Sequence, residues 1–159
     1  MCSRLEVDEG PEETSMKPFP HQYTVGATAA PDGSVALSAA GLPALSSAPP
    51  SEFDGPGDQW SPESLLMAAV VDCFVLTFRA IARASKLAWS GLECRAEGTL
   101  DRADGVTRFV RIQIQAELTL ATSGSPEMGR RLLEKAEKTC LVTNSLAVPV
   151  ELTSEVRSS

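Results

Sequence analysis

The stretch WSPESLLMAAVVDCFVLTFRAIARA, residues 60–84, decides the fold of this chain. Its first residues carry the signals of a helix start. Ser61 is a favoured N-cap residue, Pro62 suits the first helical position because its missing N–H would have no partner there, and Glu63 places negative charge where the helix dipole favours it. We therefore predict that a long helix begins at this point.

The same stretch lacks the one-sided pattern of a surface helix. Between residues 64 and 78 the only ionisable side chains are Asp72 and Cys73, and apolar residues occupy every side of the helical wheel. A helix that is apolar all round is buried on all sides. The charge-poor run of 15 residues, which ends at Arg79, is shorter than the roughly 20 residues that span a bilayer. The stretch predicts a buried central helix and not a membrane span.

The composition is that of an ordinary soluble globular protein. The 159 residues suffice for one domain, and the hydrophobic and charged fractions, 43% and 22%, are typical of such domains. A net charge of −7 argues against binding to nucleic acid or to an anionic membrane surface. No signal peptide is visible and the four cysteines lack the spacing of a disulfide framework, so we expect a cytoplasmic protein.

The chain contains few of the residues that bind metals or build histidine-based catalytic sites. His21 is the only histidine and there is no C-x-x-C pattern, so neither a zinc site nor a histidine-based nucleophile triad is expected. We predict no bound metal and no cofactor.

The segments before the central helix predict a tail and a small hairpin. Residues 1–17 contain five acidic side chains and few apolar ones, so we expect a disordered acidic tail, followed by a single domain at residues 18–159. Alternating residues from 23 to 38, interrupted by a Pro-Asp-Gly-Ser turn, predict a hairpin, and residues 42–45 are a candidate third strand. A long loop, residues 46–59, then leads into the helix.

The segments after the central helix predict a second, longer hairpin. Residues 91–100 and 110–120 each place apolar side chains on one face and polar side chains on the other. An amphipathic helix opens at Ser125, and residues 148–156 form a last strand. The expected fold is α+β, with antiparallel sheets around a buried central helix. One small sheet and one amphipathic helix would not cover that helix on every side, so we expect a homodimer.

Two motifs, each with one cysteine, give the chain a specific signature. The first is SPESLLMAA at residues 61–69, followed by Cys73-Phe74, and the second is AEKTCLVTNSL at residues 136–146, which contains Cys140. With both motifs present and the right element between them, the chain resembles the OsmC/Ohr family of osmotically induced and organic-hydroperoxide-resistance proteins. The resemblance covers roughly residues 21–156.

The resemblance implies an intertwined homodimer and a thiol peroxidase. The cysteine that matches Cys73 attacks an organic hydroperoxide and becomes a sulfenic acid, and the cysteine that matches Cys140 resolves it to a disulfide. An external dithiol, often lipoyl-linked, then restores both thiols. The position that matches Glu63 pairs with an arginine that orients the thiolate, in a site shared between subunits, so Glu63 is a third candidate catalytic residue.

Helix geometry alone does not activate Cys73. A reactive thiolate needs a positive charge, a helix N-terminus or a hydrogen-bond donor nearby. Cys73 lies twelve residues into its helix, about 18 Å from the start, so the dipole of that helix gives no help. An ionised Asp72 beside it would raise the pKa of the thiol. Glu63 lies about 15 Å from Cys73 along the axis, so the two can cooperate only across a dimer.

The chain departs from the family pattern in its arginines. One branch carries the arginine just before the Asp-Gly of the first hairpin, where this chain has Pro31, and the other carries it just before the Phe of the long loop, where this chain has Glu52. Arg79 points about 120° away from Cys73 around the helix and is a poor substitute in the same chain. Arg79 or Arg83 from a second copy of the chain stays open as the substitute. Two alternatives to the peroxidase therefore stay open: a non-catalytic dimer that binds a small apolar ligand, and a cysteine redox sensor.

Overall fold

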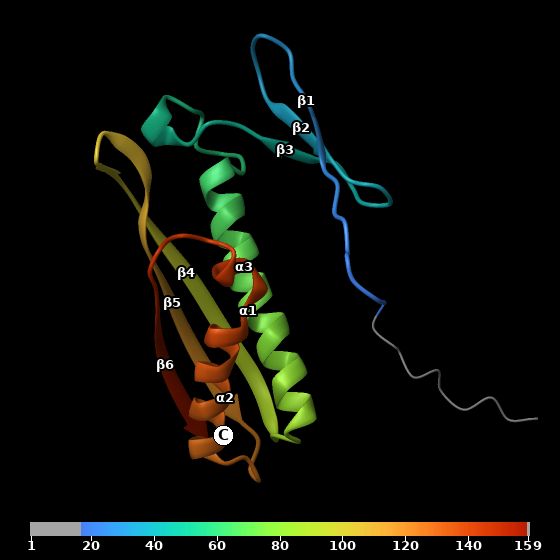
Figure 1. Cartoon of the computed structure of the whole chain (residues 1–159), viewed down its shortest axis with the longest axis vertical. Helices are drawn as coiled ribbons and strands as arrows, with labels where there is room; N and C mark the ends of the chain where they lie inside the picture. The colour runs from blue at the N-terminus through green and yellow to red at the C-terminus, as the bar shows by residue number, and fades with distance from the viewer. Residues whose placement is uncertain (1–16, 159) are drawn as a thin grey trace, which may run out of the picture.

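The computed structural model describes residues 17–158, which form two three-stranded sheets and three α-helices (Figure 1). Most of the predicted acidic tail, residues 1–16, lies outside the described residues. The mixed composition of helices and strands confirms the α+β class.

The long helix α1, Pro62–Ala84, begins where the sequence predicted. The Ser61 hydroxyl accepts a hydrogen bond of 3.2 Å from the Ser64 N–H, and the Ser64 hydroxyl accepts one of 2.9 Å from the Ser61 N–H. This is a capping box in which serine takes the place of the usual glutamate. Two N–H groups that the first turn would otherwise leave without partners are thereby satisfied.

Only one side of α1 is buried within the chain. The buried side chains are spaced four residues apart, as Val70, Phe74, Phe78 and Ala82. On the opposite side Asp72 is exposed and Leu76 keeps 50% of its surface in contact with solvent. The prediction of burial on all sides is therefore wrong for a single chain, because the sheet and the other helices cover one side alone.

The sheet that covers α1 is built from the three longest strands. Strands β4, Trp89–Ala103, and β5, Val106–Leu120, form the predicted antiparallel hairpin. Strand β6, Val150–Ser158, pairs with β5 in parallel, from Ile112↔Val150 to Leu120↔Ser158. This sheet is therefore mixed, and the antiparallel pattern expected from the sequence holds for the hairpin but not for β6.

A helical crossover explains the parallel pairing of β6. Parallel neighbours need a connection of a dozen or more residues, which is usually a helix. Here helix α2, Pro126–Thr139, and the short helix α3, Leu141–Asn144, provide it. Figure 1 shows α2 alongside α1, on the same face of the sheet.

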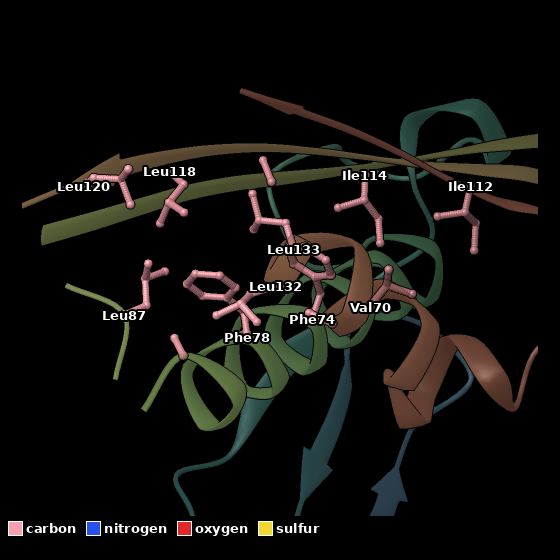
Figure 2. Close-up of a cluster of buried hydrophobic side chains, with 13 residues drawn as sticks. Val70, Phe74, Phe78, Leu87, Ile112, Ile114, Leu118, Leu120, Leu132 and Leu133 are labelled. Carbon is pink, nitrogen blue, oxygen red and sulfur yellow. The ribbon is translucent and has the colours of Figure 1, made fainter. Parts of the chain in front are cut away.

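The core lies between β5 and the two long helices. Alternate residues of β5 point toward the helices, as shown for Ile112, Ile114, Leu118 and Leu120 in Figure 2. They meet the buried stripe of α1 and Leu132 and Leu133 of α2. The predicted dry face of β5 is thus confirmed.

One residue of the predicted dry face on β4 lies elsewhere. Leu100 is exposed, although it has the same parity in the sequence as Leu92 and Ala96, which pack against the core. The pairing between β4 and β5 shifts between Thr99 and Leu100. Such a bulge changes the face to which the following side chains point.

The first sheet contains β1, Gly26–Thr28, β2, Val35–Ser38, and β3, Leu45–Ser47. The hairpin of β1 and β2 was predicted, whereas β3 begins at Leu45 and not at Leu42, which is exposed. In Figure 1 this sheet projects away from the body of the molecule. The long loop after it contains a 3-10 turn, Ser51–Phe53.

Helix α1 also meets the length and hydropathy criteria of a membrane-spanning helix, criteria that the core helices of soluble proteins meet as well. Its Phe74 and Phe78 are completely buried against the rest of the chain. Within the described chain, 22% of the most apolar window of α1 is buried.

Candidate thiol site

The structure brings Cys73 and Cys140 together. Cys73 lies in the middle of α1, and Cys140 occupies the junction between α2 and α3, which packs against α1. Both are free thiols; Cys140 is fully buried, and Cys73 keeps part of its surface exposed. A buried thiol therefore lies beside a partly accessible one.

Hydrogen bonds make Cys73 the more acidic thiol of the pair. Burial by itself would raise its pKa, but several donors outweigh that effect and the pKa is lowered. The donors, in order of effect, are the Val142 N–H, the Cys140 S–H, the Leu141 N–H and the Thr77 hydroxyl. The chain thus stabilises a Cys73 thiolate without a cationic side chain.

The environment of Cys140 raises the pKa of its thiol. Burial raises its pKa, and so do its hydrogen bond to Cys73 and the negative charge that Cys73 carries when ionised. The Thr143 N–H and hydroxyl act in the other direction but do not overcome these effects. Thr143 also donates a 3.2 Å hydrogen bond to the Cys140 carbonyl oxygen, which holds the turn in place. Cys73 therefore ionises at a lower pH than Cys140.

These contacts supply the hydrogen-bond donors that helix geometry alone did not give Cys73. Helix geometry considered α1 alone, whereas the two amide donors belong to α3, which follows in the sequence only after the hairpin and α2. Asp72 is exposed on the outer side of α1 and is not among the groups that shift the pKa of Cys73. Thr77 could have been found from the sequence, because residues four apart on a helix are neighbours.

Arg79 does not act on the Cys73 thiol of the same chain. Its guanidinium is exposed and lines a surface groove with Arg83 and Trp89, on the outer side of α1. Neither arginine is among the groups that act on Cys73 in the described chain. The positions of the family arginine, Pro31 and Glu52, are both exposed.

Glu63 lies away from the cysteines, at the start of α1. It lines a pocket of about 280 Å³ whose other residues are mostly apolar and come from β2, β3 and the long loop. Those residues are Val35, Ser47, Ala48, Pro49, Pro50, Phe53 and Pro62. The structure therefore does not bring Glu63 to Cys73 of the same chain.

Cys94 has no part in this arrangement. It packs against the core from β4, and burial raises its pKa to about 11. Within residues 17–158, no group of three or more His, Cys, Asp and Glu side chains gathers closely enough to hold a metal ion.

The family model described as OsmC-like protein matches residues 55–155. The chain belongs to the OsmC-like protein family. The match includes α1, both cysteines of the pair and the whole β4–β6 sheet up to Glu155. The resemblance noted from the two cysteine motifs is therefore confirmed.

Several similar proteins can be compared with the chain. The uncharacterized protein YmaD of Bacillus subtilis (strain 168) is 28% identical over 109 residues, which are 67% of this chain and 73% of YmaD. An OsmC-like protein of unknown function from Vibrio cholerae superposes with a TM-score of 0.80 at 14% identity, covering 86% of this chain and all of that one.

An organic hydroperoxide resistance protein OsmC from Legionella pneumophila superposes with a TM-score of 0.69 at 23% identity, and 88% of this chain covers 99% of that one. At such identities the superpositions show the shared fold.

Proposed function

We propose that this OsmC-like protein is a thiol-dependent peroxidase that reduces organic hydroperoxides. The observation that carries the proposal is the contact of two free thiols whose pKa values shift in opposite directions, down for Cys73 and up for Cys140. A thiol peroxidase needs two thiols of different acidity. The attacking sulfur must be a thiolate, and the resolving sulfur must react only after the sulfenic acid has formed. The name of the Legionella protein supports the choice of substrate.

Cys73 performs the first step. Its thiolate attacks one oxygen of the hydroperoxide, the O–O bond breaks, and one proton is taken up. The products are an alcohol and the sulfenic acid of Cys73. Cys73 is partly exposed, as the residue that meets the peroxide needs to be.

Cys140 performs the second step. Once Cys73 is a sulfenic acid it carries no negative charge, so one of the causes that raise the pKa of Cys140 disappears. The Cys140 sulfur then attacks the sulfenic sulfur, a disulfide forms and water leaves. An external dithiol, in this family often lipoyl-linked, reduces the disulfide by exchange and is itself oxidised to a disulfide.

A homodimer is part of this proposal. The outer side of α1 and the segment before β1 expose apolar side chains, among them Leu76 and Tyr23, the latter at 90%. A second copy packed on these surfaces would cover them. Glu63 is too far from Cys73 in one chain, so a role for Glu63 in the reaction requires this interface.

A cytoplasmic location suits the proposed chemistry. The described cysteines are free, and a reducing compartment would keep the pair reduced between turnovers.

The direct test is disulfide mapping. The reduced protein is treated with one equivalent of cumene hydroperoxide, quenched by alkylation and digested for mass spectrometry. The expected product is a Cys73–Cys140 disulfide, absent in Cys73→Ser and unchanged in Cys94→Ser. Free Cys73 and Cys140 after prolonged exposure would refute the proposal.

Turnover separates an enzyme from a redox sensor. With excess hydroperoxide and dihydrolipoamide, an enzyme consumes many equivalents of peroxide per chain. A sensor would form the same disulfide and then stop. Cys140→Ser should form the sulfenic acid and fail to close the disulfide, which identifies the resolving residue.

A further inference from the structure

A basic groove lies at the C-terminal end of the outer side of α1. It has a volume of about 400 Å³ and is lined by Leu76, Arg79, Ala80, Arg83 and Trp89. Both arginines are exposed. The salt bridges among residues 17–158 involve other arginines, so neither arginine of the groove has a carboxylate partner in the described chain. The basic groove thus combines an apolar surface with two positive charges.

The segment before α1, residues 51–60, has the complementary composition. Its acidic side chains, Glu52, Asp54 and Asp58, are all exposed, and the segment contains no lysine, arginine or histidine. It also exposes two aromatic side chains, Phe53 at 53% and Trp60 at 47%. This acidic loop therefore presents negative charge beside apolar rings, which are the features that the basic groove can bind.

The acidic loop cannot reach the basic groove of its own chain. In Figure 1 the loop lies beside the start of α1. Arg79 follows Pro62, the first residue of α1, by 17 residues, which is about 25 Å at 1.5 Å per residue. The two complementary surfaces lie toward opposite ends of one rigid helix, so a second copy of the chain has to join them.

A two-fold axis across the outer side of α1 brings the two surfaces together. Two copies related in this way place their helices antiparallel, with the start of one against the end of the other. Ala69 is exposed and small on this side, and small side chains let helices approach closely. With the axis at Ala69, Pro62 of one copy lies level with Leu76 of the other, since both are seven residues from Ala69. The acidic loop, which precedes Pro62, then meets the groove that begins at Leu76.

We propose that the acidic loop of each copy docks in the basic groove of the other copy. Glu52 and Asp58 face Arg79 and Arg83, and the ring of Trp60 covers Leu76. The contact occurs twice in each dimer. This inference rests on the homodimer of the proposed function, and it adds which segments meet and why they recognise each other.

The docked loop also positions the start of α1. With the axis at Ala69, Glu63 of one copy lies level with Val75 of the other, which is two residues and about 3 Å along the axis from Cys73. The acidic loop leads directly into Glu63. Its docking therefore holds Glu63 beside the thiol site of the other copy.

The test is charge reversal followed by mixing. One full-length variant carries Arg79→Glu and Arg83→Glu, and a second carries Glu52→Lys and Asp58→Lys. Each alone should dimerise at least tenfold more weakly than the wild type, because every groove then meets a loop of like charge. An equimolar mixture should recover a mixed dimer, in which both contacts join opposite charges. Native mass spectrometry separates the three possible dimers by mass.

The control and the contrary results are equally specific. Arg95→Glu with Arg111→Glu makes the same change of charge at exposed positions of β4 and β5, and its dimerisation should stay within twofold of the wild type. Two weakened variants that do not recover on mixing would overturn the proposal. So would two variants that dimerise as the wild type does, the result expected if acidic residues 6–13 of the same chain fill the groove.

A cross-link tests the contact if a charge-reversed variant fails to fold. Asp58→Cys with Arg79→Cys should form a disulfide between copies on mild oxidation, mapped by mass spectrometry to positions 58 and 79. The Cα atoms of a disulfide lie within about 7 Å, a distance that one chain cannot provide here. Thr153→Cys in place of Arg79→Cys should give no such link, since Thr153 is exposed on β6.

The outcomes separate this inference from the proposed function. A dimeric wild type that forms the Cys73–Cys140 disulfide but gives no link between positions 58 and 79 would overturn the docking alone. A monomeric wild type would overturn the docking and the homodimer together. The Cys73–Cys140 disulfide joins two residues of one chain, so its formation tests the peroxidase chemistry independently of both.

Discussion

The Cys140 side chain lies close enough to the Cys73 sulfur to lower the pKa of Cys73, and Cys73 in turn raises the pKa of Cys140. This contact joins α1 to the junction between α2 and α3 and couples the ionisation of the two thiols. The proton that stays on Cys140 stabilises the negative charge on Cys73, and that charge in turn disfavours ionisation of Cys140. Each thiol thus shifts the pKa of the other.

The first prediction concerns the pH dependence of alkylation. Only the thiolate reacts with iodoacetamide, so the rate at Cys73 should rise with pH and level off earlier than that of N-acetylcysteine, because its pKa is lowered. Cys94 should stay mostly protonated until the pH approaches its pKa of about 11. Peptide mass spectrometry over a pH series measures both rates in one sample.

Removing the second thiol should shift this profile. Cys140→Ala deletes one donor to the Cys73 thiolate, so the pKa of Cys73 should rise and its alkylation should require higher pH. Cys94→Ala is the matched control, since Cys94 is not among the groups that act on Cys73. An identical Cys73 profile in wild type and Cys140→Ala would show that the contact has no electrostatic effect.

The second prediction assigns Thr77 a positioning role. Thr77→Val removes the hydroxyl donor and keeps the shape, so the pKa of Cys73 should rise. A hydrogen bond to a charged group contributes roughly 1–2 kcal/mol, which corresponds to a loss of roughly fivefold to thirtyfold in the rate of peroxide reduction at neutral pH. Stopped-flow consumption of cumene hydroperoxide measures this rate.

The pH dependence separates this effect from a structural defect. At a pH where Cys73 is fully ionised in both proteins, the difference between wild type and Thr77→Val should nearly vanish. Thr77→Ser should recover most of the rate, and Thr107→Val, an exposed residue of β5, should behave as the wild type. A deficit that persists equally at all pH values would assign Thr77 a packing role.

Patterns within single elements could be read from the sequence. The cap at Ser61, the start of α2 after Ser125 and the dry face of β5 follow from residue type and period, and all are confirmed. The conformational preferences of the local residues determine these features, because no contact with a distant segment opposes them. The two cysteine motifs likewise predicted the family, which the match to residues 55–155 confirms.

Features that depend on contacts between distant segments could not be read in this way. The parallel pairing of β6 follows from the path of α2 and α3 across the sheet. The amide donors to Cys73 come from Leu141 and Val142, whose conformation at that point depends on the packing of α3 on α1. Helix geometry applied to α1 alone therefore gave the wrong direction for the pKa of Cys73.

The third prediction concerns the loop that leads into α1. A Cβ at Gly55 would overlap the carbonyl oxygen of Pro49 and lie 2.9 Å from that of Pro50. Backbone atoms cannot move aside as a flexible side chain can, so Gly55→Ala should destabilise the loop by roughly 1–3 kcal/mol. Limited proteolysis between residues 48 and 59 should become faster.

The control for this substitution is Gly91→Ala. A Cβ there would meet only the Cβ of Thr119, at an ordinary distance of 3.9 Å. Thermal unfolding and proteolysis of Gly91→Ala should match the wild type within error. If Gly55→Ala is as resistant as the wild type, the close approach of Pro49 does not constrain the loop in solution.

The last prediction tests the proposed homodimer through the outer side of α1. Ala69 is exposed there, beside the apolar stretch that reaches Leu76, and a second copy packed on this side would leave no room for a long charged side chain. Ala69→Arg should therefore weaken association at least tenfold, whereas Ala147→Arg, in the exposed segment before β6, should not. Sedimentation equilibrium measures both, and the wild type should sediment at twice the mass of the chain. A dimer that tolerates Ala69→Arg would place the interface elsewhere. A monomeric wild type would remove the interface, and Glu63 could then have no part in the chemistry of Cys73.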